Sequence, residues 1–82
     1  MLTMDNARLL ERIVADLEQC GGRPCVRGTR IEVAVLLDAL AEGLSAEDIR
    51  DHYPSLDPED LRAAIAYGAE LARENLWRVA AS

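Results

Sequence analysis

The chain has 82 residues, a formal net charge of −6 and 50% hydrophobic residues. A chain of this size buries only about 60% of its unfolded surface, so we expect one domain over residues 1–82 that pairs with a partner or forms a homodimer. The hydrophobic content excludes a disordered chain. No apolar run reaches the roughly 18 residues of a membrane span, and the N-terminus lacks the layout of a signal peptide, so we expect a cytoplasmic protein.

Residues 1–19 form a predicted N-terminal arm, in which residues 5–19 have two interpretations. The first is an amphipathic helix, because apolar residues recur at helical spacing: Leu9, Leu10, Ile13, Val14 and Leu17. The second is a short strand over residues 12–15, ahead of the turn-rich segment that follows. The pattern is too short to decide between them.

Residues 20–31 form a predicted structured loop, called the arginine loop below. Its helix-breaking residues are Gly21, Gly22, Pro24 and Gly28. Short extended pieces fit near residues 25–27 and 29–32. We expect Gly28 to adopt a positive φ angle and Thr29 to hydrogen-bond the loop backbone.

Charge is distributed unevenly along the chain. Residues 32–82 contain four Arg and eleven acids, a net charge of −7, whereas residues 19–31 contain three Arg and no acid. The candidate DNA-binding residues are Arg23, Arg27, Arg30 and Arg62. The competing interpretation is that these arginines pair internally with the acidic helices, and Arg30 in particular is expected to clamp an acid from a helix.

The residues with reactive side chains are few. Cys20 and Cys25 are expected to be free thiols in a reducing cytosol. His52 is the only histidine, which leaves too few ligands for a metal site and no evident base for a nucleophile. We therefore expect a protein that is not an enzyme and that holds neither a metal nor another cofactor.

Residues 32–78 predict a core of three helices. The first carries an apolar stripe from Val33 to Ala41 and ends at Gly43, a residue typical of the position after a helix. Ser45 caps a short second helix. Asp57 caps a third helix of about 20 residues. This order predicts a mainly helical, trihelical helix-turn-helix domain with a long last helix. We expect the N-terminal arm and a short β-hairpin to precede the three helices.

The third helix takes the place of a recognition helix, but its first turn carries Glu59 and Asp60, which phosphates repel. These two acids are therefore candidate partner-binding residues. Leu76 and Trp77, with Val79 beside them, add an apolar end, and tryptophan is a frequent interface anchor. The alternative for Trp77 is packing against its own core.

Two sequence blocks carry a resemblance to a known family. The first is Cys-Gly-Gly-Arg-Pro-Cys-Val-Arg-Gly-Thr-Arg-Ile at residues 20–31, and the second runs from residue 40 to residue 64 through Tyr53-Pro54-Ser55-Leu56. Together they resemble the small prokaryotic family catalogued as domain of unknown function 433, over about residues 10–72. The motif residues of the first block include Gly21, Gly22, Pro24, Gly28, Thr29 and Arg30.

The resemblance implies a homeodomain-like helix-turn-helix fold with a short N-terminal strand. It also implies an antitoxin role in a type II toxin–antitoxin pair, with a PIN-like ribonuclease as the toxin and operator DNA as a second target. The chain differs from the family pattern at Leu17 and Glu32, where prolines are usual. The first difference favours the helical interpretation of residues 5–19.

We therefore expect an antitoxin that binds and neutralises a PIN-like toxin. The alternatives are a DNA-binding transcriptional regulator that uses the arginine loop, and a structural homodimer without a nucleic-acid role.

Overall fold

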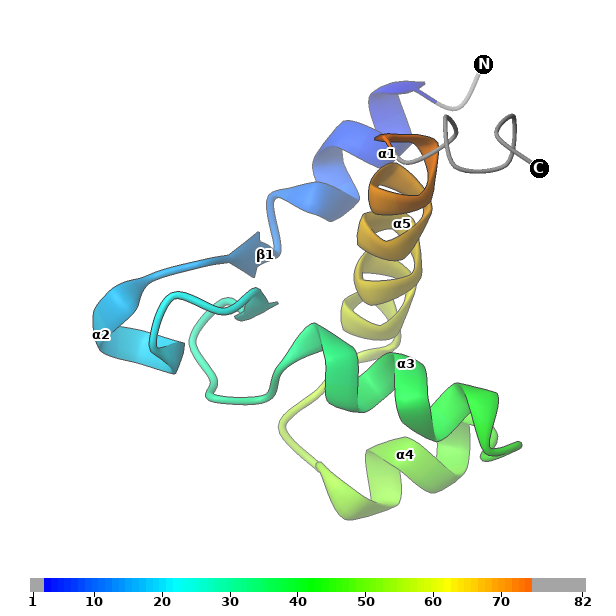
Figure 1. Cartoon of the computed structure of the whole chain (residues 1–82). Coiled ribbons are helices and arrows are strands. Elements are labelled where there is room, and N and C mark those ends of the chain that lie inside the picture. The colour runs from blue at the N-terminus through cyan, green and yellow to red at the C-terminus, as the bar shows by residue number, and fades with distance from the viewer. Residues whose placement is uncertain (1–2, 75–82) are drawn as a thin grey trace, which may run out of the picture.

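The computed structural model of the chain describes residues 3–74. Its elements are, in order, α1 (Thr3–Leu10), β1 (Ile13–Val14), α2 (Leu17–Cys20), β2 (Cys25–Val26), α3 (Val33–Ala41), α4 (Ala46–His52) and α5 (Pro58–Glu74). Figure 1 shows α1 lying beside α5, with α3 and α4 gathered towards the other end of that helix. The fold is mainly helical with one small antiparallel sheet, as the sequence predicts.

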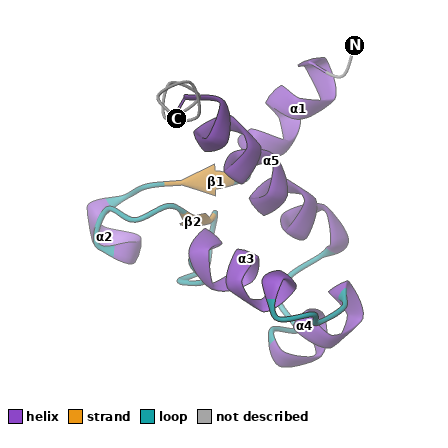
Figure 2. Ribbon diagram, turned by 45° about the vertical axis from the view of Figure 1, so that its right-hand side comes forward, coloured by secondary structure: helices purple, strands orange, loops and turns teal. Residues whose placement is uncertain are grey.

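The N-terminal segment combines the two interpretations of residues 5–19. The helix ends at Leu10, and a strand follows at Ile13–Val14. The single helix over 5–19 is therefore wrong beyond Leu10, because this strand pairs with β2 in the antiparallel register Ile13 to Val26 and Val14 to Cys25. Figure 2 shows β1 and β2 side by side, close to α5 and above α3.

A four-residue helix, α2, follows the strand. The Asp16 side chain caps it by accepting a hydrogen bond from the Glu18 N–H, with an N–O distance of 2.8 Å. Leu17 is the first helical residue, a position that proline also suits. The departure from the family pattern at Leu17 therefore leaves both the strand and the helix start intact.

Local capping signals fix the ends of the core helices. Helix α3 ends in a Schellman motif, in which Gly43, with φ of 100°, donates to the Leu40 carbonyl at 3.0 Å and Leu44 donates to the Ala39 carbonyl at 3.1 Å. Helix α4 starts with a capping box between Ser45 and Asp48. These ends fall where the glycine and serine positions predict them.

The start of α5 has the same reciprocal capping. The Asp57 N–H donates to the Asp60 carboxylate at 3.0 Å, and the Asp60 N–H donates to the Asp57 carboxylate at 3.1 Å. Pro58 is the first residue of the helix, where its missing N–H costs nothing. Asp57 is thus the cap that the sequence predicts.

The hydrophobic core joins the hairpin to the three helices. Its buried members are Val26, Val33, Leu36, Ile49, Leu56, Leu61 and Ala64. They come from β2, from α3, α4 and α5, and from the turn before α5. The core therefore holds a helix-turn-helix-like arrangement of α3, α4 and α5.

Helix α1 packs antiparallel to α5. The Asn6 side-chain amide donates to the Glu70 carboxylate at 3.3 Å, near the far end of α5. Arg12, just after α1, contacts Asp60 at the start of α5 at 3.0 Å. Within residues 3–74, no helix is both long and apolar enough to cross a membrane.

Candidate functional site

The arginine loop is a well-connected turn around Gly28. Gly28 has φ of 79°, and the Thr29 hydroxyl donates to the Val26 carbonyl at 2.8 Å. The same hydroxyl accepts a hydrogen bond from the Ile31 N–H at 3.0 Å. The roles expected for Gly28 and Thr29 are confirmed, so both residues shape the loop.

Gln19 stabilises the loop from the inside. Its side-chain amide donates to the Val26 carbonyl at 3.1 Å and also to the Thr29 carbonyl. It lies 3.5 Å from the Cys25 sulfur. Sequence reasoning missed this residue, because a glutamine at the end of a short helix carries no local signal of such a contact.

Both cysteines are free thiols, as expected. Cys25 is buried, and this burial, with the neighbouring Cys20 thiol, raises the pKa of Cys25 to about 11. The Cys25 thiol is therefore protonated at neutral pH and is a poor nucleophile.

The three arginines of the loop differ in their contacts. Arg23 pairs with Glu32 at 3.2 Å, although 72% of its side chain is exposed. Arg27 donates through Nε to the Glu11 carbonyl at 2.9 Å, which fastens the loop to the segment before β1. Arg30 is exposed, and it makes no ion pair with any residue between 3 and 74. The expected clamp from Arg30 to a helical acid is therefore wrong.

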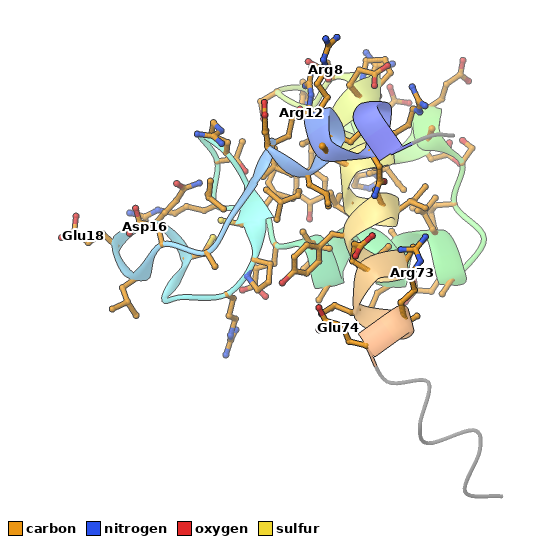
Figure 3. The ribbon with its side chains drawn as sticks, turned by 90° about the horizontal axis from the view of Figure 1, so that it is seen from above. Arg8, Arg12, Asp16, Glu18, Arg73 and Glu74 are labelled. Carbon is orange, nitrogen blue, oxygen red and sulfur yellow. The ribbon has the colours of Figure 1, made fainter. Side chains whose placement is uncertain are left out.

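Arg62 lies apart from the arginine loop. It lines an open groove of about 330 Å³ with residues of α1, of the turn after α1 and of α5: Arg8, Leu9, Arg12 and Glu59. Arg62 pairs with Glu59 at 3.1 Å. Figure 3 shows Arg8 and Arg12 projecting on the same side of the molecule. The four candidate DNA-binding arginines thus lie on two separate parts of the surface, three in the arginine loop and Arg62 on α5.

Arg12 joins the N-terminal arm to the start of α5. Its Nη1 lies 3.0 Å from Asp60 Oδ1 and 3.0 Å from Asp57 Oδ1. Hydrogen bonds to Asp60 and Asp57 raise the pKa of Arg12. Partial burial raises the pKa of Asp57, but hydrogen bonds from Arg12 and from the backbone outweigh burial and hold this pKa below its ordinary value.

The candidate partner-binding residues are therefore not equally accessible. Asp60 is only 8% exposed and its carboxylate is taken up by Arg12 and by the helix cap. Glu59 is nearer the surface and is paired with Arg62. Leu76 and Trp77, with Val79, lie outside the described residues.

A second charged surface lies on α3, α4 and the turn between them, and we call it the acidic α3–α4 surface. It consists of five exposed acids: Asp38, Glu42, Glu47, Asp48 and Asp51. Within residues 3–74, none of the five forms an ion pair. The one arginine of this segment, Arg50, donates to the Leu56 carbonyl at 3.4 Å.

Asp48 is stabilised in its ionised form. Hydrogen bonds from the Ser45 backbone and hydroxyl lower the pKa of Asp48 below its ordinary value. The same hydrogen bonds hold the Asp48 carboxylate at the start of α4, within the acidic α3–α4 surface. Sequence analysis found the acidity of residues 32–82 but did not single out these five residues.

The fold and its surfaces define a small helix-turn-helix-like domain preceded by a helix and a β-hairpin. The chain belongs to the DUF433 family, which is described as a protein of unknown function and whose family model matches residues 13–68. The resemblance seen in the two sequence blocks is therefore confirmed.

The chain is also similar to two individual proteins. A crystal structure of a DUF433 member protein from Anabaena variabilis has a TM-score of 0.67 and 31% sequence identity, over 98% of this chain and 79% of that one. An uncharacterized protein, y4eO, from Sinorhizobium fredii is 38% identical over 63 residues, which are 77% of this chain. The chain spans only 28% of that relative's length.

Proposed function

We propose that this domain is a cytoplasmic, homodimeric antitoxin that binds and neutralises a PIN-like ribonuclease toxin. The observation that carries the proposal is the acidic α3–α4 surface, whose five acids make no ion pair within residues 3–74. A nuclease needs a basic groove for its RNA substrate. A surface of unpaired carboxylates is complementary to such a groove.

The proposed mechanism is occlusion. The carboxylates of the acidic α3–α4 surface occupy the positions that RNA phosphates take in the free toxin, and RNA is thereby excluded. Opposite charges also speed the encounter of the two proteins, and this effect weakens as salt rises. The role needs no catalytic group in the antitoxin.

Operator DNA is a second candidate target, because Arg30 is exposed and has no ion pair within the described residues. Arg23 lies on the same loop and is largely exposed as well. The start of α5 is a weaker candidate for reading bases, since Asp57 and Asp60 there bind Arg12. DNA contact through the arginine loop would let the antitoxin regulate its own operon.

The test is co-purification with a co-expressed PIN-like protein, using two variants that remove the same charge. The first neutralises the acidic α3–α4 surface with Glu42→Gln, Glu47→Gln and Asp51→Asn. The second neutralises exposed acids elsewhere with Asp16→Asn, Glu18→Gln and Glu74→Gln, at sites shown in Figure 3. We expect the first variant to lose the toxin and the ribonuclease inhibition, and the second to keep both.

Equal binding by both variants would contradict the role of the acidic α3–α4 surface. Failure of the unaltered chain to bind a co-expressed PIN-like toxin would contradict the antitoxin function. The DNA candidate is tested separately with Arg30→Gln, which should weaken binding to operator DNA and reduce its salt dependence.

A further inference from the structure

An apolar groove lies between α3 and α4, within the acidic α3–α4 surface. It has a volume of about 130 Å³. Its lining residues are Val35, Ala39, Leu44, Ile49, His52 and Tyr53. Val35, on α3, is 41% exposed. The groove therefore offers carbon surface to solvent.

Acids border this groove on both helices. On α3, Asp38 comes three residues after Val35, and Glu42 comes three residues after Ala39, so the acids share the face of the lining residues. On α4, Asp48 comes four residues before the lining residue His52 and so shares its side of the helix, where the Asp48 carboxylate also accepts a hydrogen bond from the Ser45 N–H at 3.1 Å. An apolar floor with an acidic border is thus built from two neighbouring helices.

The size of the groove limits what can enter it. A dry cavity of about 150 Å³ lined by aliphatic side chains binds one benzene molecule. A groove of about 130 Å³ therefore accepts one aliphatic side chain. The acidic border favours cations beside that side chain and repels a nucleic-acid backbone.

A second copy of this chain fits the groove poorly. The whole chain has a net charge of −6. Leu17 is 80% exposed, the highest value among the large apolar residues described as exposed, but its neighbours in sequence are Asp16 and Glu18. Those carboxylates would meet the acidic border of the groove. The groove chemistry is better matched by a basic partner protein.

We propose that the α3–α4 groove binds a single aliphatic side chain, flanked by arginine or lysine, on a segment of the partner protein. The inference rests on the proposed function, since it names the part of a basic toxin that the domain grips. The apolar side chain supplies the specific contact, and the flanking cations pair with Asp38, Glu42 and Asp48.

The groove can be tested without the toxin, by methyl NMR of the full chain with short peptides. The probe is the amidated peptide Arg-Arg-Leu-Arg-Arg, and the two control peptides are Arg-Arg-Ser-Arg-Arg and Glu-Glu-Leu-Glu-Glu. We expect the first peptide to shift the methyl signals of Val35, Leu44 and Ile49 in a saturable manner. The two controls should leave these signals nearly unchanged, since each lacks one half of the recognition.

A matched pair of variants separates the groove from other exposed apolar positions. Val35→Ser removes carbon surface from the groove, whereas Ile65→Ser removes it from a 50% exposed position on α5. We expect Val35→Ser to lower the affinity for the leucine peptide at least about threefold, and Ile65→Ser to leave this affinity unchanged. Asp38→Asn with Glu42→Gln, both at exposed positions, should also weaken peptide binding, because it removes two carboxylates that pair with the arginines of the peptide.

Saturable shifts at the groove that need both leucine and arginine, and that Val35→Ser weakens, support the proposal. Shifts confined to other surfaces, equal response to the serine peptide, or groove shifts caused by self-association on concentrating the chain would each overturn it. If the peptide causes no shifts at the groove but the chain still binds its toxin, only this inference is overturned. If the peptide shifts the groove signals of the unaltered chain as expected but this chain binds no toxin, the antitoxin function is contradicted instead.

Discussion

Replacing Gly28 with alanine isolates the backbone cost of the turn in the arginine loop. Gly28 has φ of 79°, in the left-handed region that residues with a Cβ rarely adopt. A Cβ placed there meets no atom within 4 Å. The substitution therefore adds no collision, so its cost in the folded state comes from the dihedral angle.

The expected magnitude follows from two opposing terms. Holding a residue with a Cβ in the left-handed conformation costs about 1–2 kcal/mol. Alanine also restricts the unfolded chain, which returns about 0.4–1 kcal/mol. The net loss in the free energy of unfolding is about 1 kcal/mol, which lowers the melting temperature of a domain of this size by about 4–8 °C.

The assay is urea unfolding followed by circular dichroism, on the unaltered chain and on Gly28→Ala and Gly28→Asn. Asparagine tolerates the left-handed region better than alanine, so its loss should be smaller. The reasoning is refuted if Gly28→Ala unfolds at the same urea concentration as the unaltered chain. It is also refuted if the asparagine variant is the less stable of the two.

Three further predictions concern the core, the response to acid and the thiol. Leu36→Ala, at a fully buried position, should cost about 2–5 kcal/mol in urea unfolding, and a loss no larger than that of Leu17→Ala at the exposed start of α2 would contradict the packing. The folded-state pKa values of Asp48 and Asp57 are lowered, so the stability they add is present above the unfolded pKa of about 3.9 and is lost as pH falls through the folded values. The melting temperature, measured from pH 6 downwards, should therefore decrease once the pH is below about 4, and this decrease should be less steep in Asp48→Asn. Equal slopes of melting temperature against pH in the two proteins would count against this account. Burial raises the pKa of Cys25 to about 11, so at pH 8 iodoacetamide should modify it far more slowly in the folded chain than in urea; equal rates would show that the thiol is not protected.

The core helices could be predicted because their signals act over three or four residues. Ser45 and Asp48 form the box that starts α4, and Gly43 supplies the positive φ angle that ends α3. Asp57 and Pro58 start α5 in the same local manner. None of these contacts depends on the rest of the fold, so the sequence pattern is sufficient.

Contacts between distant segments could not be predicted in this way. Arg12 binds Asp57 and Asp60 across 45 and 48 positions, and in the sequence it is one arginine among nine. Gln19 reaches into the arginine loop with no motif around it. The division of residues 5–19 into helix and strand is likewise decided by pairing with β2, since the local pattern suits both.

The candidate surfaces were only partly predictable for the same reason. The arginine loop was visible as a run of basic residues without acids, but which arginine has a partner depends on Glu32 and Glu11. The acidic half of the chain was visible from composition. The groove between α3 and α4 needed the packing angle of two helices, which sequence spacing does not give.

The antiparallel packing of α1 on α5 has a consequence for how the chain is made. The ribosome releases α1 first among the described elements and α5 last, and α1 has only 8 residues. A helix shorter than about 12–15 residues is marginal in water, so α1 has no stable fold until α5 reaches it. A chain halted before α5 would leave α1 and the apolar hairpin open to proteases. The N-terminal arm thus completes its packing only after the last described helix has been made.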